Sequence, residues 1–589
     1  HLLYNTRLKR ILEGLDTYWL AKPLRTGIGQ KHSLSVELGD KFLKTKADFS
    51  YGRVNGIMKK SYRDIYSTTL DISYRYRNLL FRNKINVTGN KSSNSPYGNF
   101  ILYARMNPYM RAVEKDGKIP RYAEYETMTP NPLYDAQLEL KNQTTYLDFS
   151  DNFFVEFDFL KHFKANLRLG INAHRNDADE YYPAEHSRFH KYYMEDVFRK
   201  GSYQINEGKS HDISGDFNLN YNRILDKHIL FLNFGLKMSE KKFEETIFSA
   251  EGFPYDYMHS ISFAKQYTKD SKPVGISAVN RDIALLGYLS YSYDNRYFSD
   301  LTLRPNAASV FGTENLWATF WSIGLGWNIH NEKWMKGKDF FRQLRLRASV
   351  GSTGNQNFMN NRSLATYIYY LETTYQGFIG AYLKNMENPG LKWEQKTDYN
   401  IGMDMKIGNL DLIFSYYIAD TENMVTNIDI PLSTGFEKVS ENLGKVRNRG
   451  IELSAAYQIW QADKGFLNVN FNITTNKNKI LKISDAIKIF NENQNKIASE
   501  KGYNKPVLKY MNGMPMDAIW AVPSMGIDPS TGNEIYIKKN GTTTYEWDAS
   551  DMVMAGTSYP KYMGNFGIYG EYRHFGFNIV CNFMGGSKM

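Results

Sequence analysis

Cysteine is almost absent from this chain of 589 residues, which contains only Cys581. A single thiol excludes an internal disulfide framework and any metal site built from several cysteines. Long apolar runs are missing as well. The mean hydropathy is −0.52, and no run approaches the ~18 residues that a membrane-spanning helix needs. The sequence therefore excludes a helical membrane protein.

A leader segment and a basic block are also missing. The first residues, His1 to Asn5, contain no initiator methionine, basic segment or apolar segment of a signal peptide, and we interpret the chain as a piece of a longer protein. Lys and Arg number 73 against 62 acids, a formal net charge of +11. Because the two signs are interspersed along the chain, this charge does not predict nucleic-acid binding.

Aromatic residues, in contrast, are abundant at 15% of the chain, which is typical of the interfacial girdles of membrane barrels. The dominant pattern is a period-2 alternation, which places successive side chains on opposite faces of a strand. We expect one face to meet lipid with Phe153, Phe157, Ile213, Phe217, Leu219, Leu467, Val469 and Phe471. We expect the other to line a lumen with Asp158, Asp216, Asn218, Asn468 and Asn470.

The alternating stretches run about 9–13 residues, the length that a tilted strand needs to cross a bilayer. Connections alternate between short and long, as in outer-membrane barrels with tight periplasmic turns and long external loops. Short turns are expected near Gly39-Asp40, Arg77-Asn78, Lys161-His162, Leu225-Asp226, Asp294-Asn295, Ile407-Gly408-Asn409, Ala462-Asp463 and His574-Phe575. Long loops are expected at 89–147, 174–210, 239–281, 352–392, 420–446 and 477–558.

The pattern thus predicts an all-β fold, a transmembrane antiparallel outer-membrane β-barrel over residues 1–589. We count about 18 strands, where plugged transporters have roughly 22. The barrel is therefore expected to be incomplete, with unpaired edges near His32–Leu38 and Phe575–Phe583. A short helix is expected around Ile480–Ile489.

Ordered motifs carry a family resemblance. The most specific is LRLRASVGSTGNQ at 344–356. Others, in chain order, are TG at 26–27 with QKHSLSV at 30–36, YSYDNRY at 291–297 leading into LRPNAASVFG at 303–312, NPGLKWE at 388–394, NLG at 442–444 with NRGIEL at 448–453, GIDPSTG at 526–532 and YPKY at 559–562. Together they resemble the barrel of SusC/RagA-type TonB-dependent receptors. The sequence departs from that family at Pro305–Ala308, where Asp-Gly-Ser is commoner.

The resemblance implies an importer in the Gram-negative cell outer membrane, embedded in its lipid and taking up an oligosaccharide or peptide. It also implies a SusD-like surface lipoprotein as a lid and energy supplied by the TonB-ExbB-ExbD complex. The family's plug and TonB box, through which that complex acts, are not in this chain. Two alternatives stay open: a secreted or surface all-β adhesin or carbohydrate-binding protein, and a passive porin.

Other chemistry is weakly supported. His186 and His190 have the spacing of zinc ligands on a helix but lack a third ligand. Asp528 to Glu534 has a faint calcium-loop pattern, which a Pro-Ser-Thr-Gly turn explains better. Gly351 to Asn355 resembles a phosphate loop without its Lys-Ser/Thr pair and is interpreted as a strand exit. We therefore predict no catalytic residues, metal or cofactor.

What remains as a candidate site is aromatic loop surface. Amphipathic rings supply stacking area at low entropic cost, which suits sugars or peptides, although girdle or loop packing is the commoner use of each ring. The candidate substrate-binding residues are Tyr367, Tyr369, Tyr370, Tyr375 and Phe378.

Overall fold

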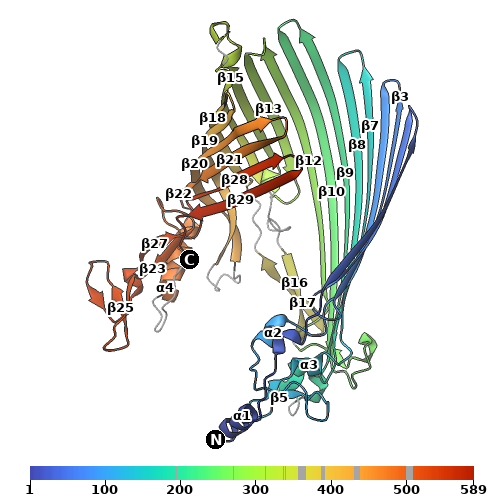
Figure 1. Cartoon of the computed structure of the whole chain (residues 1–589), viewed down its shortest axis with the longest axis vertical. Coiled ribbons are helices and arrows are strands. Elements are labelled where there is room, and N and C mark those ends of the chain that lie inside the picture. The colour runs from blue at the N-terminus through green and yellow to red at the C-terminus, as the bar shows by residue number, and fades with distance from the viewer. Residues whose placement is uncertain are drawn as a thin grey trace. The chain divides into compact units, whose positions relative to one another are not determined.

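The computed structural model is dominated by one antiparallel sheet of 20 strands. It describes residues 1–192, 196–269, 271–311, 313–335, 337, 340–355, 366–385, 392–429, 438–483, 485–498 and 509–588. Within these ranges, no helix is both long and apolar enough to cross a membrane. The chain forms two compact units (Figure 1), which are described one at a time.

Unit 1 comprises residues 1–159, 164–217 and 238–280, and unit 2 comprises 160–163, 218–237 and 281–589. A few strands contribute residues to both. The strands of unit 1 are β1 (Ile28–Gly39), β2 (Leu43–Asn55), β3 (Tyr62–Tyr76), β4 (Leu79–Ser93), β7 (Lys141–Phe159), β8 (Phe163–Tyr182), β9 (Ser202–Leu225), β10 (His228–Glu251), β11 (Gln266–Tyr267) and the start of β12 (Val274–Tyr293).

The long connections of unit 1 hold its helices and a small hairpin. These are α1 (Leu2–Leu12), η1 (Trp19–Ala21), α2 (Phe100–Ala104), β5 (Tyr122–Glu124), β6 (Thr129–Pro130), α3 (Pro132–Asp135), η2 (Ser187–Tyr192), η3 (Val197–Arg199) and η4 (Ile261–Phe263). Their buried side chains form separate small cores. Trp19, Tyr103 and Leu133 belong to one, and Tyr181, Tyr203 and Phe253 to another.

Unit 2 continues the sheet with strands that pair as successive hairpins. They are β13 (Tyr297–Ala308), β14 (Trp317–Asn328), β15 (Phe341–Asn355), β18 (Glu394–Ile407), β19 (Leu410–Asp429), β20 (Lys438–Ala462), β21 (Gly465–Thr475), β22 (Lys477–Lys482), β28 (Tyr562–Tyr572) and β29 (Phe575–Gly585).

Its connections hold smaller elements. These are η5 (Thr313–Asn315), η6 (Ile329–Asn331), η7 (Lys333–Met335), β16 (Thr366–Tyr375), β17 (Phe378–Asn385), α4 (Asp485–Ala498), β23 (Ala518–Ala521), β24 (Ser524–Ile527), β25 (Glu534–Ile537), β26 (Thr543–Thr544), η9 (Ala549–Asp551) and β27 (Val553–Thr557).

The predicted short turns are confirmed, since a strand ends and the next begins around each of the eight positions. Positive φ angles mark several of them, including two of the three-residue turns. Asp294 and Asn295 have φ of 50° and 52°, and Leu160 and Lys161 have 49° and 60°. Two successive left-handed residues form the hairpin turn whose twist matches that of the flanking strands.

The expected separation of the strand faces is confirmed. Phe471 opposes Phe566 across β21 and β28, while on the other face the Asn472 amide donates to Asn565 Oδ1 at 2.9 Å. Phe157 and Ile213 are 45% and 56% exposed. Large apolar side chains left exposed on strands suit a lipid solvent, and the assignment of the two faces to lipid and lumen stays a prediction.

A polar pair interrupts the apolar face in unit 1. Asp151 lies on the same face of β7 as Phe153, and it accepts a 2.7 Å hydrogen bond from the Asn83 amide on β4. Because each group satisfies the other, the pair costs less than either polar side chain alone. The alternation rule therefore fails at this position in a way that only cross-strand partners explain.

The expected strand count is confirmed in the described part of the chain. Apart from the short β11 and β22, the 20-stranded sheet consists of eighteen strands. β1 is paired along its length with β2, and β29 with β28. Whether the other edge of each of these two strands is free stays a prediction.

The predicted loop and helix boundaries need correction. β10 runs to Glu251, β19 to Asp429 and β15 to Asn355, so much of the expected loops is strand. Polar side chains on both faces hid these extensions, because a strand in water needs no apolar face to keep its backbone hydrogen bonds. The expected helix at Ile480–Ile489 begins instead at Asp485, after β22.

Candidate binding site in the loops of unit 1

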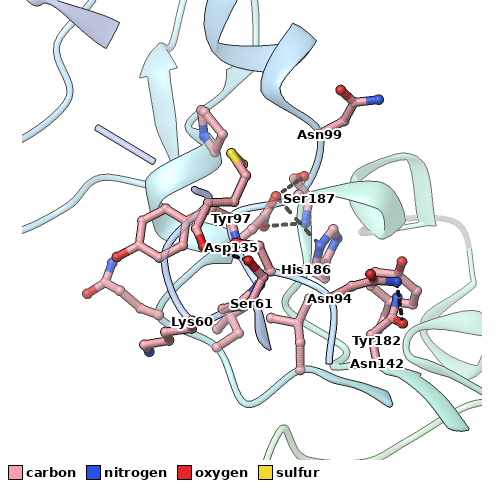
Figure 2. Close-up of a pocket in the computed structure, with 18 of the residues that line it drawn as sticks. Lys60, Ser61, Asn94, Tyr97, Asn99, Asp135, Asn142, Tyr182, His186 and Ser187 are labelled. Atoms are coloured by element: carbon pink, nitrogen blue, oxygen red, sulfur yellow. Dashed lines mark hydrogen bonds and ion pairs between the residues drawn. The ribbon is translucent and has the colours of Figure 1, made fainter. Parts of the chain in front are cut away.

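A cavity of about 1110 Å³ lies among the long connections of unit 1. Its walls come from the end of β4 and the segment after it, the α3 region, the end of β8, and η2 (Figure 2). The lining residues are Met58, Lys60, Ser61, Ser93, Asn94, Ser95, Pro96, Tyr97, Gly98, Asn99, Leu102, Pro132, Asp135, Gln137, Leu138, Glu139, Leu140, Asn142, Tyr181, Tyr182, His186, Ser187 and Arg188.

Two capped helices hold the wall in place. Asn99 precedes α2, and its side chain accepts from Ile101 N. Asn131 precedes α3, accepts from Leu133 N and is fully buried. Pro132 then occupies the first turn, where its missing N–H costs nothing. Asparagine before a helix is a favoured cap, so this local sequence fixes where α3 begins and thereby where Asp135 lies.

Asp135 joins α3 to η2. Its carboxylate accepts hydrogen bonds from Ser187 N at 2.9 Å and from Ser187 Oγ at 2.5 Å. Figure 2 shows His186 beside the same carboxylate, with Nε2 3.8 Å from Asp135 Oδ2. Nδ1 of His186 accepts from Arg188 N, which leaves the proton of a neutral ring on Nε2, toward Asp135.

The environment of His186 lowers its pKa below the ordinary 6.5. Burial is the main cause, because it penalises the imidazolium; Asp135 opposes the shift and Arg188 adds to it. The ring is therefore neutral at physiological pH. It presents an N–H to the carboxylate rather than a full ion pair.

A tyrosine and amide wall faces this group. The Asn94 amide donates to Asn142 Oδ1 at 2.9 Å, and the Tyr182 hydroxyl donates to Glu180 Oε1 at 2.5 Å. The Arg188 guanidinium lies over the Tyr182 ring, 3.7 Å from its centroid. The cavity thus combines an aromatic ring with amide, carboxylate and cationic groups, the mixture that binds polar organic ligands.

The geometry does not suit hydrolysis. Ser187 Oγ donates to Asp135, not to the imidazole, so the described contacts lack the serine–histidine hydrogen bond that activates a nucleophile. Within the described residues, no group of three or more His, Cys, Asp or Glu side chains is arranged to hold a metal ion.

The sequence-predicted aromatic residues lie elsewhere, on the β16–β17 hairpin of unit 2. Tyr375 is the register partner of Phe378, and Tyr369 pairs with Ala381. Tyr367 and Phe378 are 64% and 75% exposed. The hairpin brings the five residues onto one element, and their role in binding stays a prediction.

The other motifs are resolved by their contacts. His190 does not share the partners of His186, because its Nδ1 forms a hydrogen bond with the Tyr122 hydroxyl at 2.6 Å. The turn at Asp528 is confirmed, with the carboxylate accepting from Ser530 N and Ser530 Oγ. Gly351 to Asn355 form the end of β15, as expected.

The sequence did not reveal the cavity. Most of its residues fall in the two loops 89–147 and 174–210, which show no periodicity, and Met58, Lys60 and Ser61 come from the connection between β2 and β3. The signals that were available were the two Asn caps and the polar run Ser93-Asn94-Ser95. His186 was noticed, but as a possible metal ligand rather than as part of a hydrogen-bonded cavity wall.

The fold defines the class of protein. An antiparallel sheet of eighteen principal strands, in which tight turns alternate along the chain with long structured connections, is the architecture of an outer-membrane β-barrel. The solved structure of the RagAB peptide transporter has the same fold: the TM-score is 0.81 at 19% identity, over 97% of this chain and 63% of that one.

Sequence comparison gives the family. The profile of the TonB dependent receptor-like β-barrel family matches residues 38–578. The chain belongs to this family of outer-membrane proteins, and it is of the SusC/RagA type. It is 26% identical to the TonB-dependent receptor SusC of Bacteroides thetaiotaomicron over 95% of its own length, and 26% identical to a TonB-dependent receptor of Formosa agariphila over 64%. It spans 58% and 35% of those two proteins.

Proposed function

We propose that this chain forms the barrel of an active importer that captures a polar nutrient, an oligosaccharide or a peptide, in the unit 1 cavity before passage through the membrane. The observation that carries the proposal is the cavity itself, about 1110 Å³ and walled by the loops of unit 1 and the strand ends that lead into them. The family assignment favours this function over a secreted adhesin or a passive porin.

The groups in the cavity suit both substrate classes. Asn and Gln amides donate and accept, as do the amides of a peptide and the hydroxyls of a sugar. The Tyr182 ring offers a flat apolar face, and the Arg188 guanidinium beside it offers a donor fork. Neutral amides bind weakly enough for release, which transport requires.

Two partners complete the proposal. A SusD-like lipoprotein would close over the long connections, and the TonB-ExbB-ExbD complex would supply the energy through parts of the protein outside this chain. Similarity to SusC and to the RagA component of RagAB supports both partners. The rigid, mutually hydrogen-bonded loops of unit 1 provide a surface on which a lid can dock.

The experiment is whole-cell uptake in a strain whose only copy of this receptor is the variant under test. Two fluorescent probes are used separately, a size-graded mixture of neutral oligosaccharides and a mixture of short peptides. Tyr182→Ala removes the ring and its hydroxyl contact with Glu180. We expect uptake of one probe to fall about tenfold or more, since an aromatic contact contributes roughly 1–3 kcal/mol in a buried site.

Tyr255→Ala is the matched control. Tyr255 is a loop tyrosine of unit 1, 58% exposed and stacked on Tyr257, and it does not line the cavity. Uptake in this variant should match the parent. Equal uptake of both probes in Tyr182→Ala and the parent, with equal amounts of protein at the cell surface, would refute the assignment of the cavity.

A further inference from the structure

A second cavity, of about 850 Å³, lies in unit 2 where β20, the end of β21 and β22 meet the segments 513–517 and 554–561. Methionine and proline form much of its wall, with Met514, Pro515 and Met516 in sequence. Three amides form another part: Asn476 and Asn478 both donate to Asn448 Oδ1, at 3.3 and 2.9 Å.

Charge in this cavity is strongly one-sided. Four cationic side chains line it, Arg449, Lys477, Lys479 and Lys561, against a single carboxylate, Asp517. That carboxylate accepts from Tyr559 N at 2.9 Å, a bond that holds the wall together. Among the described contacts, none of the four cations forms an ion pair with a carboxylate.

The neighbouring cations on the same strand behave differently. Arg447 makes two hydrogen bonds to Asp420, at 2.6 and 2.8 Å, and Lys445 lies 2.7 Å from Glu422. The acids of β19 are thus matched to Lys445 and Arg447, while the four cations of the cavity form no ion pair within the described part of the chain. Uncompensated cations that converge on a cavity create a site for an anion.

The cavity lies at a defined level of the strands. Arg449 and Lys477 are cross-strand partners, and Arg449 shares the apolar face of β20 with Ile451 and Tyr457, which are 42% and 49% exposed. Ile451 lies two positions after Arg449, which is about 7 Å along the strand. The cations therefore begin where the apolar face ends, toward the strand ends that lead into the long connections.

We propose that this cavity binds the phosphate-bearing headgroup of a lipid in the outer leaflet of the outer membrane. The apolar face below would contact the acyl chains, and cations at the membrane surface attract anionic headgroups. This site is distinct from the loop cavity of unit 1, and it neither requires nor tests nutrient import.

The test compares two double variants of the purified protein in vesicles made with a phosphorylated outer-leaflet glycolipid. Lys477→Ala with Lys479→Ala removes two of the four cations. Lys464→Ala with Arg573→Ala removes the same charge from the short turns at the opposite end of the neighbouring strands. Bound glycolipid is counted by native mass spectrometry after mild detergent extraction, and thermal unfolding confirms that both variants are folded.

We expect the Lys477/Lys479 variant to retain glycolipid at least about tenfold less well, and the Lys464/Arg573 variant to match the parent. Enzymatic removal of the lipid phosphates should abolish the difference. Inorganic phosphate at millimolar concentration should not displace the lipid, because the apolar contacts are missing; full displacement would identify a free-phosphate site instead. Equal retention by the two variants, or retention that is independent of the lipid phosphates, would overturn the proposal.

Discussion

Asp135 and Ser187 are joined by two hydrogen bonds although 52 residues separate them in the chain. The contact ties α3, in the connection between β4 and β7, to η2, in the connection between β8 and β9. A carboxylate that accepts both a backbone N–H and a hydroxyl fixes the position and the orientation of its partner. This contact therefore helps to fix the shape of the unit 1 cavity.

Ser187→Ala removes the hydroxyl bond and leaves the backbone bond. A hydrogen bond to a charged group contributes roughly 1.5–3 kcal/mol, so we expect residues 183–192 to open more easily by about that free energy. Amide hydrogen exchange followed by mass spectrometry measures the local opening. Ser260→Ala, an exposed loop serine of the same unit, is the control, and equal exchange in both variants would contradict the role of the Asp135–Ser187 bond.

Acid should weaken unit 1 through His186. Its pKa is lowered in the folded protein, mainly by burial, so the unfolded chain takes up a proton near pH 6.5 and the folded chain only at lower pH. The stabilising contribution is complete above pH 6.5 and is lost as the pH falls toward the lowered value. His186→Gln should flatten the fall in melting temperature between pH 7 and 5. An unchanged slope would show that another group controls the effect.

The two faces of β21 should respond differently to the same charge. Val469→Lys places an ammonium on the face predicted to meet lipid, at a cost of about 2–4 kcal/mol near the bilayer midplane. Asn468→Lys places it on the opposite face, where we expect a change within about 0.5 kcal/mol. Urea titration of the protein folded into lipid vesicles measures both. A larger loss from Asn468→Lys would reverse the assignment of the faces.

Removal of the β16–β17 hairpin should abolish uptake without preventing membrane insertion. Asn355 and Glu394 are register partners on β15 and β18, so deletion of 356–391 with two glycines inserted before Lys392 leaves both strands paired. It also keeps Trp393, which packs on Phe311. Surface protein is measured by protease accessibility, and uptake with the probes described above. Full uptake would show that Tyr367, Phe378 and their neighbours do not bind substrate.

Much of the sheet could be predicted from local sequence. A strand with Leu467, Val469 and Phe471 on one face and Asn468 and Asn470 on the other has only one register that separates them, and tight turns need residues such as Asp294-Asn295 that tolerate a positive φ. Because these signals come from residues close together in the chain, each strand can be located from its own sequence. The ordered family motifs supplied the rest of the architecture.

The cavity could not be predicted in this way. It depends on contacts such as Asp135 with Ser187 and Asn94 with Asn142, which join loops that share no period and whose residues are unremarkable in isolation. The alternation pattern failed to predict the Asp151–Asn83 pair for the same reason. An acid on an apolar face is acceptable only with a partner on the next strand. Long-range pairing of polar groups leaves no trace in a single sequence.

The length of β7 and β8 sets how far the unit 1 cavity stands from the hydrocarbon. β8 contains 20 residues from Phe163 to Tyr182, whereas about 9–11 residues suffice to cross a bilayer. At about 3.4 Å per residue, the last half of the strand is roughly 30 Å long, and in the predicted membrane placement it lies outside the bilayer. Ligands would then bind at the level of the surface sugars, at the end of a hydrogen-bonded sheet. A lid could engage the cavity without touching the membrane.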